Sequence, residues 1–190
     1  LKYKLESGGL KAAQSYQKAI NALSENDSLI IRNDGFKQNK RTPPQLPQSI
    51  VGMVHWGRSG TGLLHSLIDG HPNVTTFPSV YFSEYFFPRN WEDLTAQGWD
   101  QITERFIAKY DVLFDASSRV PVATTSFKLN DGFGIKEGLA NVGENADEIL
   151  TVDRNHFKDT LDSFMEHYEE VDAFSFFQLA QLAYEEVINP

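Results

Sequence analysis

Apolar residues recur at steps of three and four along much of the chain, the spacing that places side chains on one face of an α-helix. Asp153 and Asn155 precede one of these segments. Either could cap a helix there, because both side chains accept hydrogen bonds from backbone N–H groups. The pattern predicts helices over Leu10–Ser24, Thr61–Gly70, Asn90–Tyr110, His156–Tyr168 and Ala173–Asn189.

Three short apolar runs lack this spacing and are typical of β-strands: Ile50–His55, Asn73–Phe77 and Asp111–Ala116. Because Ile50–His55 is apolar on both faces, we expect it to be a central strand of a parallel sheet. Strands that alternate with helices favour the α/β class, in which helices cover such a sheet.

A polar segment between residues 33 and 48 divides the chain. It contains Pro43, Pro44 and Pro47 and is predicted to be a linker, because proline interrupts regular backbone hydrogen bonding. We therefore expect a helical segment (residues 1–32), a linker (33–48) and an α/β domain (49–190). Leu10–Ser24 resembles the second helix of a tetratricopeptide repeat, and it is either the remnant of a repeat array or a lone docking helix.

Composition narrows the classes of function. Of the 190 residues, 41% are hydrophobic, which is typical of globular proteins, and no apolar run approaches the ~20 residues of a membrane span. The net charge of −9 argues against a nucleic-acid partner. Cysteine is absent, which excludes disulfides and fits a cytoplasmic location. The histidines form no ligand motif, so we expect no metal.

The segment Ser49–Val74 carries the most specific chemistry. An apolar run leads into a turn that contains Gly57, Arg58, Ser59, Gly60, Thr61 and Gly62, and a leucine-rich helix follows. A helix N-terminus attracts anions, because its first N–H groups are unpaired and its dipole is positive there. Glycines allow the backbone to approach the anion closely, and Arg58 adds a charged donor. The pattern predicts a phosphate or sulfate site.

The same residues argue against a nucleoside triphosphatase. A Walker A loop ends in Gly-Lys-Ser/Thr, and the only possible frame runs from Gly52 to Ser59 with Arg58 in place of lysine. That frame places Gly52 inside the expected strand and leaves Gly60 and Gly62 without a role. A second interpretation remains, in which the glycines shape an ordinary turn between strand and helix.

The basic-Ser-Gly-Thr turn, the helix and the following His71-Pro72-Asn73 together resemble the sulfotransferases that use 3′-phosphoadenosine 5′-phosphosulfate (PAPS). Gly62 departs from that family, which usually has a second Thr or Ser there. The resemblance implies a three-layer sandwich around a central parallel sheet, with PAPS bound at residues 57–62 as co-substrate. It also implies transfer of a sulfuryl group to a hydroxyl or amine of a small-molecule or carbohydrate acceptor, with Arg58 neutralising the leaving phosphate.

Sulfuryl transfer also needs a base near the sulfate. The segment Ser83-Glu84-Tyr85-Phe86-Phe87 resembles the Glu-x-x-Phe-Phe of heparan-type sulfotransferases, although one residue is missing between the glutamate and the aromatic pair. The resemblance implies that Glu84 is the base and that Phe82, Phe86 and Phe87 pack beneath the cofactor loop. Glu84 could equally be a solvent-facing residue. His65, four residues after Thr61 on the helix, is the second candidate for the base.

Members of this family bind the 3′-phosphate of PAPS with an arginine and a serine on later segments. Arg119 with Ser126, and Arg154 with Ser163, match that pattern loosely, so we expect the true pair beyond Pro190 and the chain to be the N-terminal part of a larger enzyme. A second function stays open, namely a non-catalytic interaction module with a vestigial anion loop. It would contact protein partners through the N-terminal helix.

Overall fold

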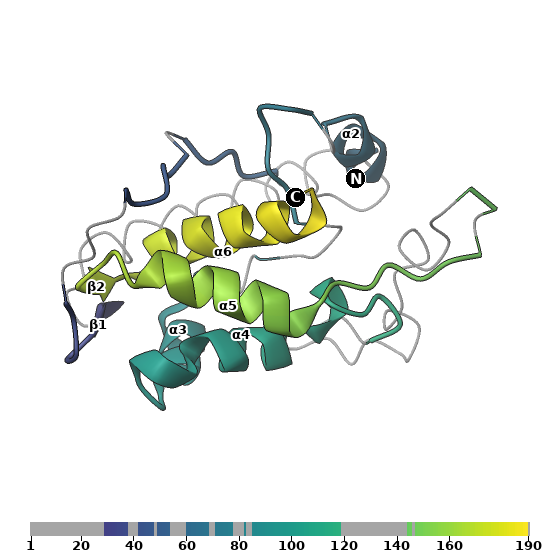
Figure 1. Cartoon of the computed structure of the whole chain (residues 1–190). Helices are drawn as coiled ribbons and strands as arrows, with labels where there is room; N and C mark the ends of the chain where they lie inside the picture. Colours follow the sequence, from purple (N-terminus) through teal and green to yellow (C-terminus); the bar gives the residue numbers. More distant parts are fainter. Residues whose placement is uncertain are drawn as a thin grey trace, which may run out of the picture.

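The computed structural model describes residues 29–37, 42–47, 49–53, 60–68, 71–77, 82, 85–118, 144–145 and 147–189 (Figure 1). This part of the chain is mainly helical and includes a short pair of strands. The α-helices are α2 (Thr61–Ile68), α3 (Pro88–Thr95), α4 (Ile102–Lys109), α5 (Arg154–Met165) and α6 (Ala173–Ile188). The strands are β1 (Ile31–Arg32) and β2 (Glu170–Val171), and two 3₁₀ turns are η2 (Trp99–Gln101) and η3 (Asp111–Leu113).

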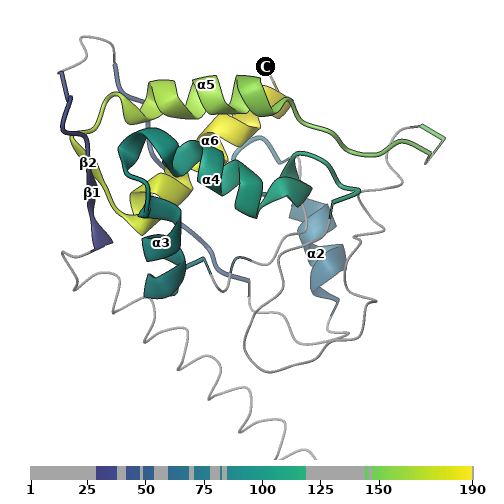
Figure 2. The same cartoon turned by 90° about the horizontal axis from the view of Figure 1, so that it is seen from below.

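Helices α3 to α6 form one packed body. α5 lies along α6, α4 packs against α5, and α3 packs against α4. The small sheet lies at one end of this body, whereas α2 lies toward the opposite end in both views (Figures 1 and 2). The structure therefore separates Gly60 and α2 from the end that carries the sheet.

The two strands join the start of the described chain to the connection between α5 and α6. They pair antiparallel, with Ile31 opposite Val171 and Arg32 opposite Glu170. Ile31 and Val171 are buried, so the sheet adds to the core on one face. This is the only sheet among the described residues, and they contain no parallel strands.

Side-chain caps define where α5 and α6 begin. The Oδ1 atom of Asp153 accepts hydrogen bonds from the backbone N–H of Asn155 (2.8 Å) and His156 (3.0 Å), so Asp153 is the predicted cap that forms. At α6, Asp172 and Ser175 form a reciprocal capping box. Each cap satisfies backbone donors that a helix start would leave unpaired.

The core is built largely from aromatic rings supplied by α4, α5, α6 and the segment before α3. Phe106 packs against Phe176 with ring centroids 5.6 Å apart, and Phe114 packs against Phe157 at 4.8 Å. The polar ends of buried rings have partners, as they must in an apolar interior. The hydroxyl of Tyr184 donates to the carbonyl oxygen of Leu113 at 2.6 Å.

Several predicted helices are confirmed. α2, α5 and α6 lie within a few residues of the predicted ranges. The predicted helix Asn90–Tyr110 forms as two helices, because Gly98 adopts φ 84° and ψ −177° between them. That backbone conformation suits glycine and ends α3. Leu10–Ser24 lies outside the described residues.

The prediction of strands was wrong for the described residues concerned. Ile50–Met53, the described part of Ile50–His55, forms no strand and is exposed, with 85% of the Val51 surface open to solvent. Asn73–Phe77 also forms no strand, although Phe77 is buried. Apolar composition produces a strand only where a neighbouring strand supplies hydrogen bonds, and none pairs with these residues.

Asp111–Ala116 is likewise not a strand. Its first residues form η3, in which the N–H of Phe114 donates to the carbonyl oxygen of Asp111 at 2.9 Å. These local bonds satisfy the backbone directly after α4. An isolated antiparallel bridge follows, between Asp115 and Thr151. The described chain thus combines helices with a little strand, and the expected central parallel sheet is not among these residues.

Candidate functional site

The glycine-rich turn is described from Gly60 onward. Gly60 has φ 79°, in the left-handed region, and a Cβ built on it would meet no atom within 4 Å. Its carbonyl oxygen accepts the N–H of Leu64 at 3.0 Å, which closes the first turn of α2. Gly60 is exposed, so the start of α2 is open to solvent. This backbone geometry is the one that glycine provides without strain.

Most of the predicted site residues lie outside the described residues: Gly57, Arg58, Ser59 and Glu84. Thr61 and Gly62 lie in the first turn of α2, but the side chain of Thr61 is not among those described. The structure therefore places the backbone of Gly60, Thr61 and Gly62 as a turn that leads into a helix. The roles of Arg58 and Glu84 stay predictions.

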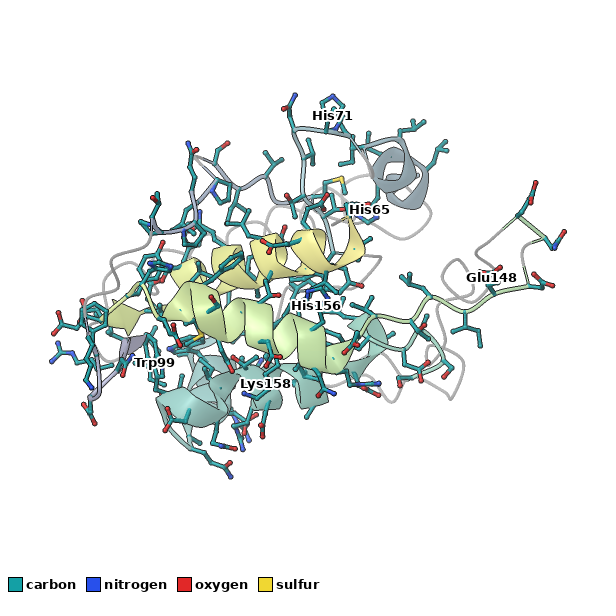
Figure 3. All side chains as sticks on the ribbon, in the orientation of Figure 1. His65, His71, Trp99, Glu148, His156 and Lys158 are labelled. Carbon is teal, nitrogen blue, oxygen red and sulfur yellow. The ribbon has the colours of Figure 1, made fainter. Side chains whose placement is uncertain are left out.

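His65 and His71 belong to α2 and the segment after it (Figure 3). His65 is half-buried on α2. The N–H of His71 donates to the carbonyl oxygen of Ile68 at 3.2 Å, and its Nδ1 atom accepts the N–H of Asn73 at 3.2 Å. His71 therefore takes part in a turn directly after the predicted helix Thr61–Gly70.

Phe82 and Phe86, which lie on either side of Glu84 in the sequence, pack against the helical core. The ring of Phe82 lies 4.9 Å from that of Tyr110, and the ring of Phe86 lies 5.2 Å from that of Phe177. Phe87 is more exposed and precedes α3 as its N-cap. These ring contacts hold Phe82 against Tyr110, directly after α4, and Phe86 against α6. Their packing beneath the cofactor loop stays a prediction, because residues 57–59 lie outside the described residues.

Arg154 is engaged by a carboxylate. It opens α5, and its Nε and Nη2 atoms donate to Oδ1 of Asp111 at 3.1 and 2.5 Å. The hydroxyl of Ser118 donates to the other carboxylate oxygen at 2.5 Å. The hydrogen bond from Ser118, followed by Arg154, lowers the pKa of Asp111. The charge of Arg154 is therefore balanced inside the protein, which removes it as a natural 3′-phosphate ligand. Asp111 and Arg154 are 43 residues apart in the sequence, so no local motif predicts that they pair.

A second feature, which sequence reasoning missed, is a polar groove of about 620 Å³. Small-molecule sites are of this order of size. The turn after β1, η2 and α5 each contribute to it. Its lining residues are Asn33, Gly35, Lys37, Trp99, Asp100, Lys158, Asp162 and Glu166. Polar residues recur at every fourth position along α5, and this pattern is the sequence signal that could have indicated the groove.

Among the described residues, no group of three histidine, aspartate or glutamate side chains is arranged to hold a metal ion. No helix in the described ranges is both long enough and apolar enough to cross a membrane. Comparison of the chain with family models, curated proteins and solved structures finds no match.

Proposed function

We propose that this chain binds PAPS at the turn Gly57–Gly62 and transfers its sulfuryl group to a hydroxyl or amine of a small-molecule or carbohydrate acceptor. The observation that carries the proposal is the conformation of Gly60 directly before α2. A left-handed glycine at that point leaves the first N–H groups of the helix accessible, and these groups favour an anion. The basic-Ser-Gly-Thr sequence around it supports phosphosulfate over a bare phosphate.

In the proposed reaction, the acceptor oxygen or nitrogen attacks sulfur and the bond between sulfur and the 5′-phosphate oxygen breaks. Glu84 takes the acceptor proton. Arg58 neutralises the phosphate that leaves on 3′-phosphoadenosine 5′-phosphate (PAP). Preorganised positive charge at the leaving group is the largest contribution that a protein makes to such a transfer.

The proposal includes the expected fold, a three-layer sandwich around a central parallel sheet. The described residues do not contain that sheet. It also includes a cytoplasmic location, because the sequence lacks cysteine. The acidic net charge favours a neutral acceptor over an anionic polysaccharide and argues against nucleic acid.

Calorimetry with PAP tests the proposal. The wild-type chain is expected to bind PAP, and Arg58→Ala is expected to bind it about 10- to 100-fold more weakly, because a charge-assisted contact is lost. Arg89→Ala is the matched control, since Arg89 is exposed on α3, in a different helix from the turn. Equal binding by wild type and Arg58→Ala would overturn the proposal.

An interaction module is the second candidate, and the surface of α2 favours it. Leu63 is 68% exposed and Leu67 is 72% exposed, one turn apart on the same helix. Exposed apolar side chains grouped on one helix are typical of protein contacts. An interaction module predicts no heat with PAP from either the wild type or Arg58→Ala, which separates the two candidates.

A further inference from the structure

The polar groove shares no lining residue with α2 or with the described part of the proposed PAPS site, Gly60–Gly62. Figure 3 shows Trp99 toward the sheet and Lys158 along the middle of α5, whereas His65 and His71 lie at α2 and the segment after it. Three segments that are distant in the sequence build it, and two of them are regular elements. A groove made in this way exists before any ligand arrives, which lowers the cost of binding.

The floor of the groove is held by a hydrogen-bond network on α5. Asp162 accepts the hydroxyl of Thr103 on one carboxylate oxygen (2.6 Å) and Lys158 on the other (2.5 Å). Glu104 lies 3.9 Å from the same lysine. The opposite face of α5 is anchored in the core, where Phe157 and Leu161 are fully buried. Lys158 and Asp162 are thus fixed in position.

Other polar groups in the lining are available to a ligand. Within the described ranges, Lys37, Asp100 and Glu166 form no ion pair. The ammonium group of Lys37 donates hydrogen bonds, and the carboxylates of Asp100 and Glu166 accept them. A hydroxyl both donates and accepts, so a ligand with several hydroxyls can use both kinds of partner at once.

Trp99 is the aromatic component of the lining. It is half-buried and packs partly against the core, so its position is supported from within the protein. An indole combines a broad apolar face with one N–H donor. This combination suits a ring that has an apolar C–H face and a polar hydroxyl edge, as a sugar does.

The charge of the lining argues for a neutral ligand. Two lysines (Lys37 and Lys158) face three carboxylates (Asp100, Asp162 and Glu166), which leaves one net negative charge. The three carboxylates would repel a phosphorylated or sulfated ligand, and the two lysines would repel a cationic ligand. We propose that this groove binds a neutral saccharide, with Trp99 against the sugar ring and Lys37, Asp100 and Glu166 on its hydroxyls.

Titration of the isotope-labelled full chain with maltotriose, cellotriose and chitotriose, followed by NMR, tests the proposal. The amide of Gly35 and the indole N–H of Trp99 are expected to shift in a saturable manner with at least one of these sugars. The expected Kd is below about 10 mM, as for a weak, open site. No saturable shift with any of the three would overturn the proposal, and so would binding only of a sulfated oligosaccharide.

Variants locate the binding. Asp100→Ala and Lys37→Ala change exposed residues and are each expected to weaken saccharide binding about tenfold, the usual effect of losing a hydrogen bond to a charged group. Glu92→Ala, an exposed change on α3, is the matched control and should leave the Kd unchanged. Arg58→Ala should also leave it unchanged, because the groove does not depend on PAPS binding. Unaltered binding in both Asp100→Ala and Lys37→Ala would exclude this groove as the site.

Discussion

The guanidinium of Arg154 holds one carboxylate oxygen of Asp111 with two of its nitrogen atoms, at 3.1 and 2.5 Å. The pair joins the first residue of α5 to the segment that follows α4. Ser118 occupies the second carboxylate oxygen. Asp111 thus links three points of the chain, and the ionised form of its side chain is the one that all three contacts favour.

Asp111 should contribute to loss of stability in acid. Its pKa is lowered in the folded protein, chiefly by Ser118 and then by Arg154, so its contribution is present above the unfolded value of about 3.9 and is lost as the pH falls through the folded value. Asp111→Asn removes this titration. Between pH 6 and pH 3, the free energy of unfolding, measured with urea, should fall less in Asp111→Asn than in the wild type.

Two other aspartates have pKa values lowered by local hydrogen bonds, Asp115 by Ser117 and Asp153 by the N–H groups of His156 and Asn155. Both keep these local hydrogen bonds in Asp111→Asn, so the part of the acid effect that comes from those bonds cancels in the comparison. Parallel acid curves for wild type and Asp111→Asn would show that the contacts of Asp111 do not stabilise the fold.

Tyr85→Phe should destabilise the protein by about 1 kcal/mol. The Tyr85 ring is fully buried, and its hydroxyl donates to the carbonyl oxygen of Ala173 at 2.7 Å. Phenylalanine keeps the ring packing and loses only this bond. Urea unfolding measures the difference, and Tyr168→Phe, a change at a half-buried ring, is the control, expected within about 0.5 kcal/mol of wild type. No difference between Tyr85→Phe and the control would contradict the prediction.

Gly98→Ala should cost about 1–3 kcal/mol through backbone strain alone. Gly98 has φ 84°, yet an added Cβ would meet no atom within 4 Å. Gly52 offers the same open space without a positive φ, so Gly52→Ala isolates the strain from the steric effect. Thermal unfolding should show a lower Tm for Gly98→Ala and little change, or a small increase, for Gly52→Ala. Equal effects at both glycines would argue against strain.

Glu84→Gln tests the proposed base. Glutamine keeps the size of the side chain but does not take a proton at neutral pH, so turnover should fall ~10²–10⁴-fold while PAP affinity stays nearly constant. Stopped assays of sulfuryl transfer, with calorimetry alongside, separate the two effects. Normal turnover in Glu84→Gln would move the search for the base to His65.

Sequence reasoning predicted the helices well because their signals are local. The periodicity of α5 and α6 comes from residues that face the core, and the Asp153 cap lies within three residues of the N–H groups it binds. Strands are different, since an apolar segment becomes a strand only when a partner pairs with it. Ile50–Met53 has strand-like composition but no such partner among the described residues. Asp111–Ala116 meets a neighbouring segment only at the isolated bridge between Asp115 and Thr151, which is too short to make a strand.

The two candidate sites also differ in how far the sequence alone could predict them. The glycine-rich turn could be predicted because its residues are consecutive, and Gly60 has the left-handed backbone that such a turn needs. The polar groove could not, because its lining combines a turn near residue 35 with α5, far along the chain. Only the packing of α5 against its neighbours brings those residues together.

The bridge between Asp115 and Thr151 has a consequence for how this protein can change in evolution. The segments around Asp115 and Thr151 meet at this point, where the N–H of Ala116 also donates to the carbonyl oxygen of Leu150 at 3.0 Å. Since the two ends meet regardless of what lies between them, the number of intervening residues is free to vary at little entropic cost. Insertions, deletions and grafted peptides can therefore accumulate at this point without disturbing the aromatic core.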